Sequence, residues 1–391
     1  MAGVASMSNE SEPMIANKVS RLRKKPSNST APSPATTALT EAVAEKDVKD
    51  LHRIMKLTRL FDERCMMLQR QGRIGFYVPS FGQEAIAVGS AFPLKTEDWL
   101  FPSYREPGLF LSRGVALEVL LANLLGSASD ICKGRQMPVH YSYRKAHLFS
   151  ISSPIATQVI QAVGAAVGMQ IQKTKAVVAT YFGDGATSAN DFHTALTFAG
   201  VYKAPVIFVC TNNQLAISVP VSHQSGARCL ADKAVGYGVA GESVDGNDLI
   251  AVIGAMTRAV ERARSGQGAT LLECVTYRLG PHSSSDDPTR YRSEEEYQRW
   301  KKRDPLLLSR VWLQDRNAWS EEEEAALELE LKSHIQQAIE LAEQVPPPNV
   351  ESLFDDVYAT LPSELREQRK ALQEEAAQRG AFANTSEAFP L

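Results

Sequence analysis

Two polar side chains stand just after two apolar runs in the middle of the chain, and their types suit a metal ion. Asp184 follows the run 176–182, and Asn213 follows the run 205–210. Short runs rich in β-branched and aromatic residues, each ended by turn residues, predict buried strands of a parallel sheet. We expect residues 189–203 to form the crossover helix between them. Asp184 and Asn213 would then lie at the carboxyl ends of two parallel strands, where open α/β sheets bind ligands.

The residues around Asp184 indicate which ligand this edge of the sheet would take. Gly183 and Gly185 let the backbone approach a phosphate closely, and the helix start that follows offers free N–H groups to an anion. Mg²⁺ takes few protein ligands and completes its octahedron with water and phosphate oxygens. A Gly-Asp-Gly alone is more often a turn than a site. Paired with Asn213, each after a buried strand, it predicts a site for magnesium and a diphosphate.

The rest of the chain alternates strand and helix patterns that would position this site. Such alternation predicts an α/β fold with one doubly wound, mainly parallel sheet and helices on both faces. The predicted helices are 47–71, 116–125, 157–172 and 249–264, and the further predicted strand segments are 239–248 and 271–278, followed by a polar loop at 280–292.

Composition excludes several classes of protein. The chain has 391 residues, of which 44% are hydrophobic and 22% charged, as in ordinary globular proteins with a large core. A net charge of −3 gives no electrostatic case for binding nucleic acid or an anionic membrane. No apolar run reaches the roughly 18 residues that span a bilayer. Five cysteines without a Cys-x-x-Cys indicate neither a zinc site nor a disulfide framework, and favour a reducing compartment.

The two ends of the chain differ in composition from its middle. Residues 1–45 are rich in Ser, Pro, Thr and Ala, which cannot bury enough surface to order a segment. A mitochondrial targeting peptide is the alternative, but such peptides avoid acidic residues and Glu10 and Glu12 come early. We expect a disordered tail at 1–45, a cofactor-binding domain at 46–300 and a helical extension at 301–391 packed on that domain. The expected location is a bacterial cytoplasm, with the mitochondrial matrix as the alternative.

These segments carry a family resemblance. The Gly-Asp-Gly and Asn-Asn pair is similar to the thiamine diphosphate motif. The chain resembles the α subunit of the E1 component of 2-oxo acid dehydrogenases, of the branched-chain (2-oxoisovalerate) type more than the pyruvate type. The resemblance covers roughly residues 45–390. Further matching segments are 101–106, 134–140, 151–158 and 277–287.

The resemblance implies an activity and a set of partners. It implies thiamine diphosphate-dependent oxidative decarboxylation of 2-oxo acids, with reductive acylation of lipoyl groups on a separate E2 protein. This chain contains the diphosphate half of the cofactor site, so a separate β subunit would hold the other half in an α₂β₂ heterotetramer. Two alternatives stay open, a pyruvate or acetoin dehydrogenase α subunit and a non-catalytic scaffold paralogue. Asp184, Asn213, Arg105 and His282 are all present, which counts against the scaffold.

The resemblance also assigns roles to particular residues. His282 matches a catalytic histidine near the reacting carbon, and Ser283 matches a serine that is phosphorylated in animal and plant relatives. Phe76, Tyr104 and Ser152 would form the substrate pocket. The implied cofactor-binding residues are Tyr104, Arg105, Ser153, Ile155, Gly183, Asp184, Gly185, Ala186, Asn213 and His282.

Two metal sites are implied in the same way. Asp184, Asn213 and the backbone carbonyl of Leu215 would ligate Mg²⁺. A potassium ion found in branched-chain relatives would take Ser152, Pro154, Thr157 and Gln158.

The chain departs from the family pattern at three positions. Thr211 stands where many branched-chain relatives carry an arginine that meets the diphosphate. Leu215 replaces a common aromatic residue, which leaves its backbone carbonyl unchanged. Pro281 replaces a second histidine, and Gly-Pro-His also occurs in bacterial pyruvate-type subunits, which keeps the pyruvate alternative open.

Overall fold

A computed structural model describes residues 43–379 of the chain, all of which belong to one compact unit. The expected disordered tail at 1–45 therefore lies almost wholly outside the described residues. None of the helices within 43–379 is both long and apolar enough to cross a membrane.

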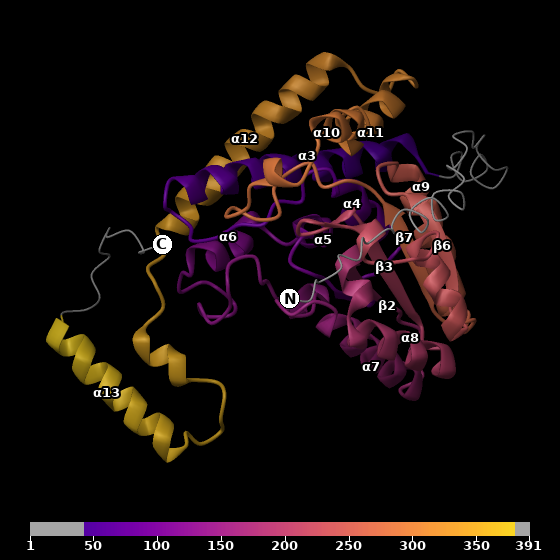
Figure 1. Ribbon diagram of the computed structural model, residues 1–391. Helices are drawn as coiled ribbons and strands as arrows, with labels where there is room; N and C mark the ends of the chain where they lie inside the picture. Colours follow the sequence, from indigo (N-terminus) through magenta and orange to yellow (C-terminus); the bar gives the residue numbers. More distant parts are fainter. Residues whose placement is uncertain (1–42, 380–391) are drawn as a thin grey trace, which may run out of the picture. The chain divides into compact units, whose positions relative to one another are not determined.

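A five-stranded sheet forms the centre of this unit (Figure 1). Its order is β1-β2-β3-β7-β6, and every neighbouring pair is parallel. The register sets Gly183 opposite Thr211, so the ends of β2 and β3 that carry the two predicted metal ligands are level. The strands are β1 (Trp99–Phe101), β2 (Val178–Gly183), β3 (Val206–Asn212), β6 (Ala240–Asp245) and β7 (Thr270–Val275), and a separate antiparallel pair comprises β4 (Leu215–Ala216) and β5 (Val219–Pro220).

Both faces of the sheet are covered by helices, as the sequence predicts. Side chains of a strand alternate between faces, and the core divides accordingly. Val178, Phe182 and Phe208 pack in the cluster that contains α7 and α8, whereas Tyr181 and Val209 pack in the cluster that contains α4, α5 and α9. These helices are α4 (Glu84–Ala91), α5 (Pro107–Ser112), α7 (Thr157–Ile171), α8 (Asn190–Tyr202) and α9 (Leu249–Arg264).

Helices that precede and follow the strands in the chain pack beside this sheet domain. Helix α12 contacts both α3 and α6, and Figure 1 shows α12 crossing α3. Its start is stabilised by a capping box between Ser320 and Glu323. The remaining helices are α3 (Glu45–Arg70), α6 (Leu117–Leu125), α10 (Glu294–Lys301), α11 (Pro305–Gln314), α12 (Glu321–Glu343) and α13 (Ser363–Arg379), with 3-10 turns η1 (Arg144–Ala146), η2 (Asp184–Ser188), η3 (Val221–His223), η4 (Leu230–Tyr237), η5 (Pro288–Arg290) and η6 (Val350–Phe354).

The predicted elements are present, with one local difference at the site. No α-helix starts directly after Gly185. The chain first makes the 3-10 turn η2, in which Thr187 Oγ1 donates to Asp184 O at 2.8 Å, and α8 begins only after an extended Ala189. The amides nearest the strand end therefore belong to a 3-10 turn. By contrast, α9 begins and ends at the predicted residues because Asp248 caps it, accepting from two backbone amides.

Candidate active site

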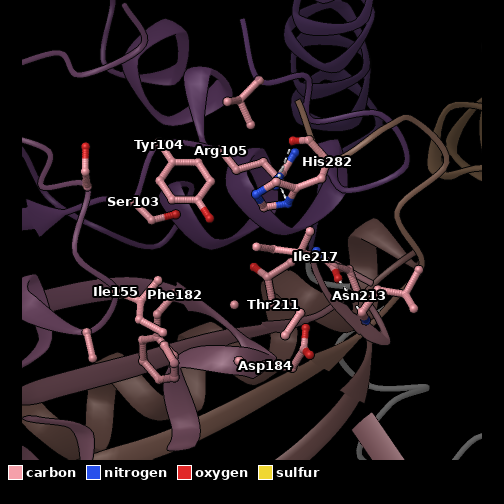
Figure 2. Close-up of a pocket in the computed structure, with 18 of the residues that line it drawn as sticks. Ser103, Tyr104, Arg105, Ile155, Phe182, Asp184, Thr211, Asn213, Ile217 and His282 are labelled. Carbon is pink, nitrogen blue, oxygen red and sulfur yellow. Dashed lines mark hydrogen bonds between the residues drawn. The ribbon is translucent and has the colours of Figure 1, made fainter. Parts of the chain in front are cut away.

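A cavity of about 560 Å³ opens at the carboxyl ends of β2 and β3 (Figure 2). Asp184, Thr211 and Asn213 come from the strand ends, while Tyr104, Arg105 and His282 lie across the cavity from them. All ten residues of the predicted cofactor-binding set line it, as do Phe76, Ser152, Gln158 and Leu215. Pro154, Thr157 and Ser283 do not line it.

Asp184 presents a carboxylate to the cavity without a direct salt bridge among the described residues. The side chain is buried and accepts a hydrogen bond from Gln224 Nε2 at 2.8 Å, and it makes no salt bridge within residues 43–379. Burial raises the pKa of Asp184, opposed by the bond from Gln224, by its own backbone amide, by the positive charge of Arg278 and by the Asn213 amide. A bound cation would offset this burial cost. The described residues contain no cluster of three or more His, Cys, Asp or Glu fit for a metal, so Asp184 would act with amide and carbonyl oxygens.

Glycine is needed for a different physical reason at each of the two positions beside Asp184. A Cβ added at Gly183 meets no atom within 4 Å, so this backbone borders open space. At Gly185, an added Cβ would lie 2.7 Å from the Ala216 side chain. The expectation that both glycines admit a phosphate therefore changes: in this structure Gly183 leaves room, whereas Gly185 lets the 215–219 hairpin pack against η2.

The chain after Asn213 is strained, and one buried arginine holds it. Gln214 and Ile217 have φ angles of 73° and 56°, which non-glycine residues seldom adopt. The angle is most unusual at Ile217, because its side chain is β-branched. Arg278, 1% exposed, donates to Leu215 O at 3.1 Å and to Ile217 O at 2.5 Å. A carbonyl oxygen has two lone pairs, so Leu215 O keeps one for a metal. Strained backbone held from several sides is typical of a functional loop.

Across the cavity, Arg105 controls the protonation of His282. Its Nη2 donates to His282 Nδ1 at 3.1 Å and to His282 O at 2.9 Å, and its Nη1 donates to Pro79 O at 2.6 Å. Guanidinium groups cannot accept, so Nδ1 is the acceptor and the proton of the neutral ring is on Nε2. Burial, helped by the charges of Arg105 and Arg278, lowers the pKa of His282 to about 4. His282 is therefore a neutral Nε2–H donor near pH 7.

The loop that carries His282 is held against residues 77–80. Ser284 N donates to Tyr77 O at 2.8 Å, and Tyr77 N donates to Ser284 Oγ at 3.1 Å. Asp286 accepts from His282 N at 2.6 Å. Beneath them, buried Asp62 accepts from the Tyr77 hydroxyl at 2.6 Å and from the Ser80 amide at 2.6 Å. Both sides of the loop are thereby fixed, and His282 is positioned by contacts that reach helix α3.

The segment predicted to hold potassium offers part of a site. Gln158 Nε2 donates to Tyr181 O at 2.7 Å, which leaves Gln158 Oε1 buried with no hydrogen-bond partner among the described residues. Ala156, before α7, has a φ of 68° and turns the backbone there. An unpaired buried oxygen suits a cation. Pro154 is exposed and Thr157 half-buried, and neither faces the main cavity.

Several residues of the cavity escaped the sequence analysis. His140 donates from Nδ1 to Pro138 O at 2.9 Å, so its Nε2 accepts from the Ser153 hydroxyl at 2.5 Å and orients it. Gln83, Gln224 and Arg278 also line the cavity. Arg278 and His140 lay inside segments that matched the family, which was a usable signal. Gln83 and Gln224 lie in segments without any chemical pattern.

Comparison with known proteins identifies the family. Residues 52–351 match the family described as dehydrogenase E1 component. The chain belongs to the dehydrogenase E1 component family. Members of this family use thiamine diphosphate. The buried Asp184 carboxylate and the open space at Gly183 fit the diphosphate end of that cofactor with a bound cation.

Individual relatives of this E1 chain carry consistent names. One relative is 2-oxoisovalerate dehydrogenase subunit alpha 2, mitochondrial, of Arabidopsis thaliana. The two sequences are 44% identical over 84% of this chain and 69% of the relative. The corresponding alpha subunit of Homo sapiens is 42% identical over 84% of this chain and 74% of its own. The 3-methyl-2-oxobutanoate dehydrogenase subunit alpha of Mycobacterium tuberculosis is 43% identical over 85% of this chain and 88% of its own.

Proposed function

We propose that this chain is the α subunit of a branched-chain 2-oxo acid dehydrogenase, of the 3-methyl-2-oxobutanoate dehydrogenase type. The observation that carries the proposal is the arrangement of the cavity. Asp184 and Asn213 come from level ends of β2 and β3, and His282 lies across from them. The names of the three relatives support the substrate class. A pyruvate or acetoin dehydrogenase α subunit is the alternative.

The cofactor would lie with its diphosphate between the strand ends and Arg105. Asp184, Asn213 and the carbonyl of Leu215 would hold Mg²⁺, and the backbone at Gly183 leaves room for the phosphates. Bound thiamine diphosphate supplies the carbanion chemistry of 2-oxo acid decarboxylation. We assign potassium to Ser152, Pro154, Thr157 and Gln158, where the unpaired Gln158 Oε1 supports a cation.

The residues of this chain act on the substrate mainly through His282. Burial and the charge of Arg105 keep its ring neutral, and the bond from Arg105 to Nδ1 places the proton on Nε2. Nε2 would then donate a hydrogen bond to the substrate oxygen as charge develops. Phe76, Tyr104 and Ser152 would surround the substrate, and His140 fixes the hydroxyl of Ser153 beside the cofactor. The hydrogen bonds of Ser284 and Asp286 hold the loop, and with it His282, in this position in the cavity wall.

The proposal includes partners and a location. A β subunit would complete the other half of the cofactor site in an α₂β₂ assembly, and the acyl group would pass to lipoyl groups of E2. Two of the three relatives are named mitochondrial and the third is bacterial. A bacterial cytoplasm is the proposed location, with the mitochondrial matrix as the alternative.

We also propose Ser283 as a regulatory phosphorylation site. Its side chain is 8% exposed and accepts from the Ser285 amide, so the loop must open before a kinase reaches it. A phosphate brings about −1.5 to −2 charges next to the carboxylate of Asp286, whose backbone amide already donates to Ser283 O at 3.1 Å. Like-charge repulsion would therefore open the loop. Phosphorylation would hold the loop away from residues 77–80 and displace His282.

Assay of the chain assembled with its cognate β subunit tests the substrate assignment. We expect kcat/KM for 3-methyl-2-oxobutanoate to exceed that for pyruvate by at least about 10–200-fold. This is the discrimination that a single methylene supplies in an apolar pocket, and the larger substrate has two more carbons than pyruvate. Each subunit assayed alone is the control and should show no turnover, because the cofactor site is divided. A preference for pyruvate would contradict the proposal and support a pyruvate dehydrogenase α subunit. An assembly that binds cofactor but is inactive would indicate a non-catalytic scaffold.

A further inference from the structure

Gln83 has no assigned role, yet it stands in the wall of the cavity beside a predicted metal ligand. It precedes helix α4 and its side chain is 4% exposed. Its Oε1 accepts a hydrogen bond from Asn213 Nδ2 at 3.1 Å. Its Nε2 is buried and has no hydrogen-bond partner among residues 43–379. A buried amide with one end bonded and the other free is rare in folded proteins, so the free end requires an explanation.

The orientation of these two amides follows from a backbone group. The Leu215 N–H can only donate, and it donates to the Asn213 side chain at 3.2 Å. That end of Asn213 is therefore oxygen, and its other end is the NH₂ group that meets Gln83. The Gln83 atom that accepts from this NH₂ group must therefore be its oxygen, Oε1. Flipping either amide would set two donors against each other, so the Gln83 NH₂ group is the free end.

We propose that Gln83 binds the cofactor by donating from Nε2 to an oxygen of the magnesium-bound diphosphate, an inference that rests on the proposed function. A ligand oxygen in the cavity fits this free donor, because no described protein group accepts a bond from it. Gln83 also fixes the Asn213 amide through Oε1, which keeps Asn213 Oδ1 as the oxygen available to a cation. One side chain thus serves both the metal ligand and the phosphate.

Two substitutions separate these contributions. Gln83→Glu keeps the shape and an acceptor for Asn213 Nδ2 but removes the donor. Gln83→Met removes donor and acceptor without adding charge. Gln161→Glu is the matched control, because it makes the same chemical change at an exposed position of α7.

Calorimetric titration of the assembled, cofactor-free protein with thiamine diphosphate and Mg²⁺ measures the effect. We expect Kd to rise about 10–100-fold for Gln83→Met, the loss of a hydrogen bond to a charged group, and further for Gln83→Glu. The control should match the wild type. Thermal unfolding of the cofactor-free variants is measured as well, because Gln83→Glu buries a carboxylate and Gln83→Met leaves Asn213 Nδ2 without an acceptor. Both losses of stability should be small beside the loss of affinity.

The outcomes decide between this inference and the proposed function. If the wild type fails to bind the cofactor, the proposed function fails. If the wild type binds and both Gln83 variants bind equally well, only the role of Gln83 is overturned. If the cofactor-free variants lose stability in proportion to their loss of affinity, Gln83 supports the fold and does not bind the ligand.

Discussion

Replacing His282 with alanine is expected to lower kcat by about 10²–10⁴-fold, the range for a positioned acid–base group, while leaving cofactor affinity within a few-fold of wild type. The physical reason is its place in the cavity. The groups predicted to hold Mg²⁺ lie at the strand ends, whereas His282 lies across the cavity from them. An interaction made mainly in the transition state appears in kcat rather than in ground-state binding.

Steady-state kinetics beside cofactor titration of the assembled enzyme measures both quantities. His334→Ala, at an exposed position of helix α12, is the matched control and should leave both unchanged. His282→Gln adds a further comparison, because an amide can donate a hydrogen bond but cannot move a proton. A near-normal kcat for His282→Ala would remove this loop from the chemistry and leave its bonds to Arg105 as a purely structural feature.

The parts of the site that the sequence predicts are those with a local pattern. Asp184 and Asn213 follow apolar runs whose strands pair in register, so their meeting follows from parallel topology alone. The doubly wound sheet follows from the alternation of strands and helices. The His282 loop was located by resemblance, but its neutral ring depends on Arg105, which is far away in sequence and arrives only through folding.

The residues that escaped prediction act through tertiary contacts. Gln224 reaches Asp184 from beyond the short β4–β5 hairpin, and Arg278 stabilises a hairpin whose strain lies at Gln214 and Ile217. The sequence around Gln224 and the sequence around Arg278 contain no pattern that indicates these contacts. The 3-10 turn at η2 was missed for a related reason, since it is shaped by the close approach of Ala216 to Gly185.

Asp184→Ala is expected to abolish Mg²⁺-dependent binding of thiamine diphosphate without unfolding the protein. Asp184 would supply the only carboxylate among the metal ligands. Its removal should therefore exceed the roughly 10–100-fold loss of affinity that follows from deleting an outer-shell partner of a metal site. The fold should survive because burial already disfavours the charged form, as the raised pKa of Asp184 indicates. Removing a buried charge that lacks a cation relieves that cost.

Calorimetric titration with cofactor, with and without Mg²⁺, measures this loss, and thermal unfolding of the cofactor-free protein checks the fold. Asp191→Ala is the matched control, because Asp191 is an exposed aspartate in the first turn of α8. In the wild type, the raised pKa also means that protons compete with Mg²⁺, so cofactor affinity should fall as the pH is lowered towards the pKa of Asp184. The alanine variant has no such group and should lose that dependence. Unchanged affinity in Asp184→Ala would refute the metal role, and the strand-end cavity would need another ligand.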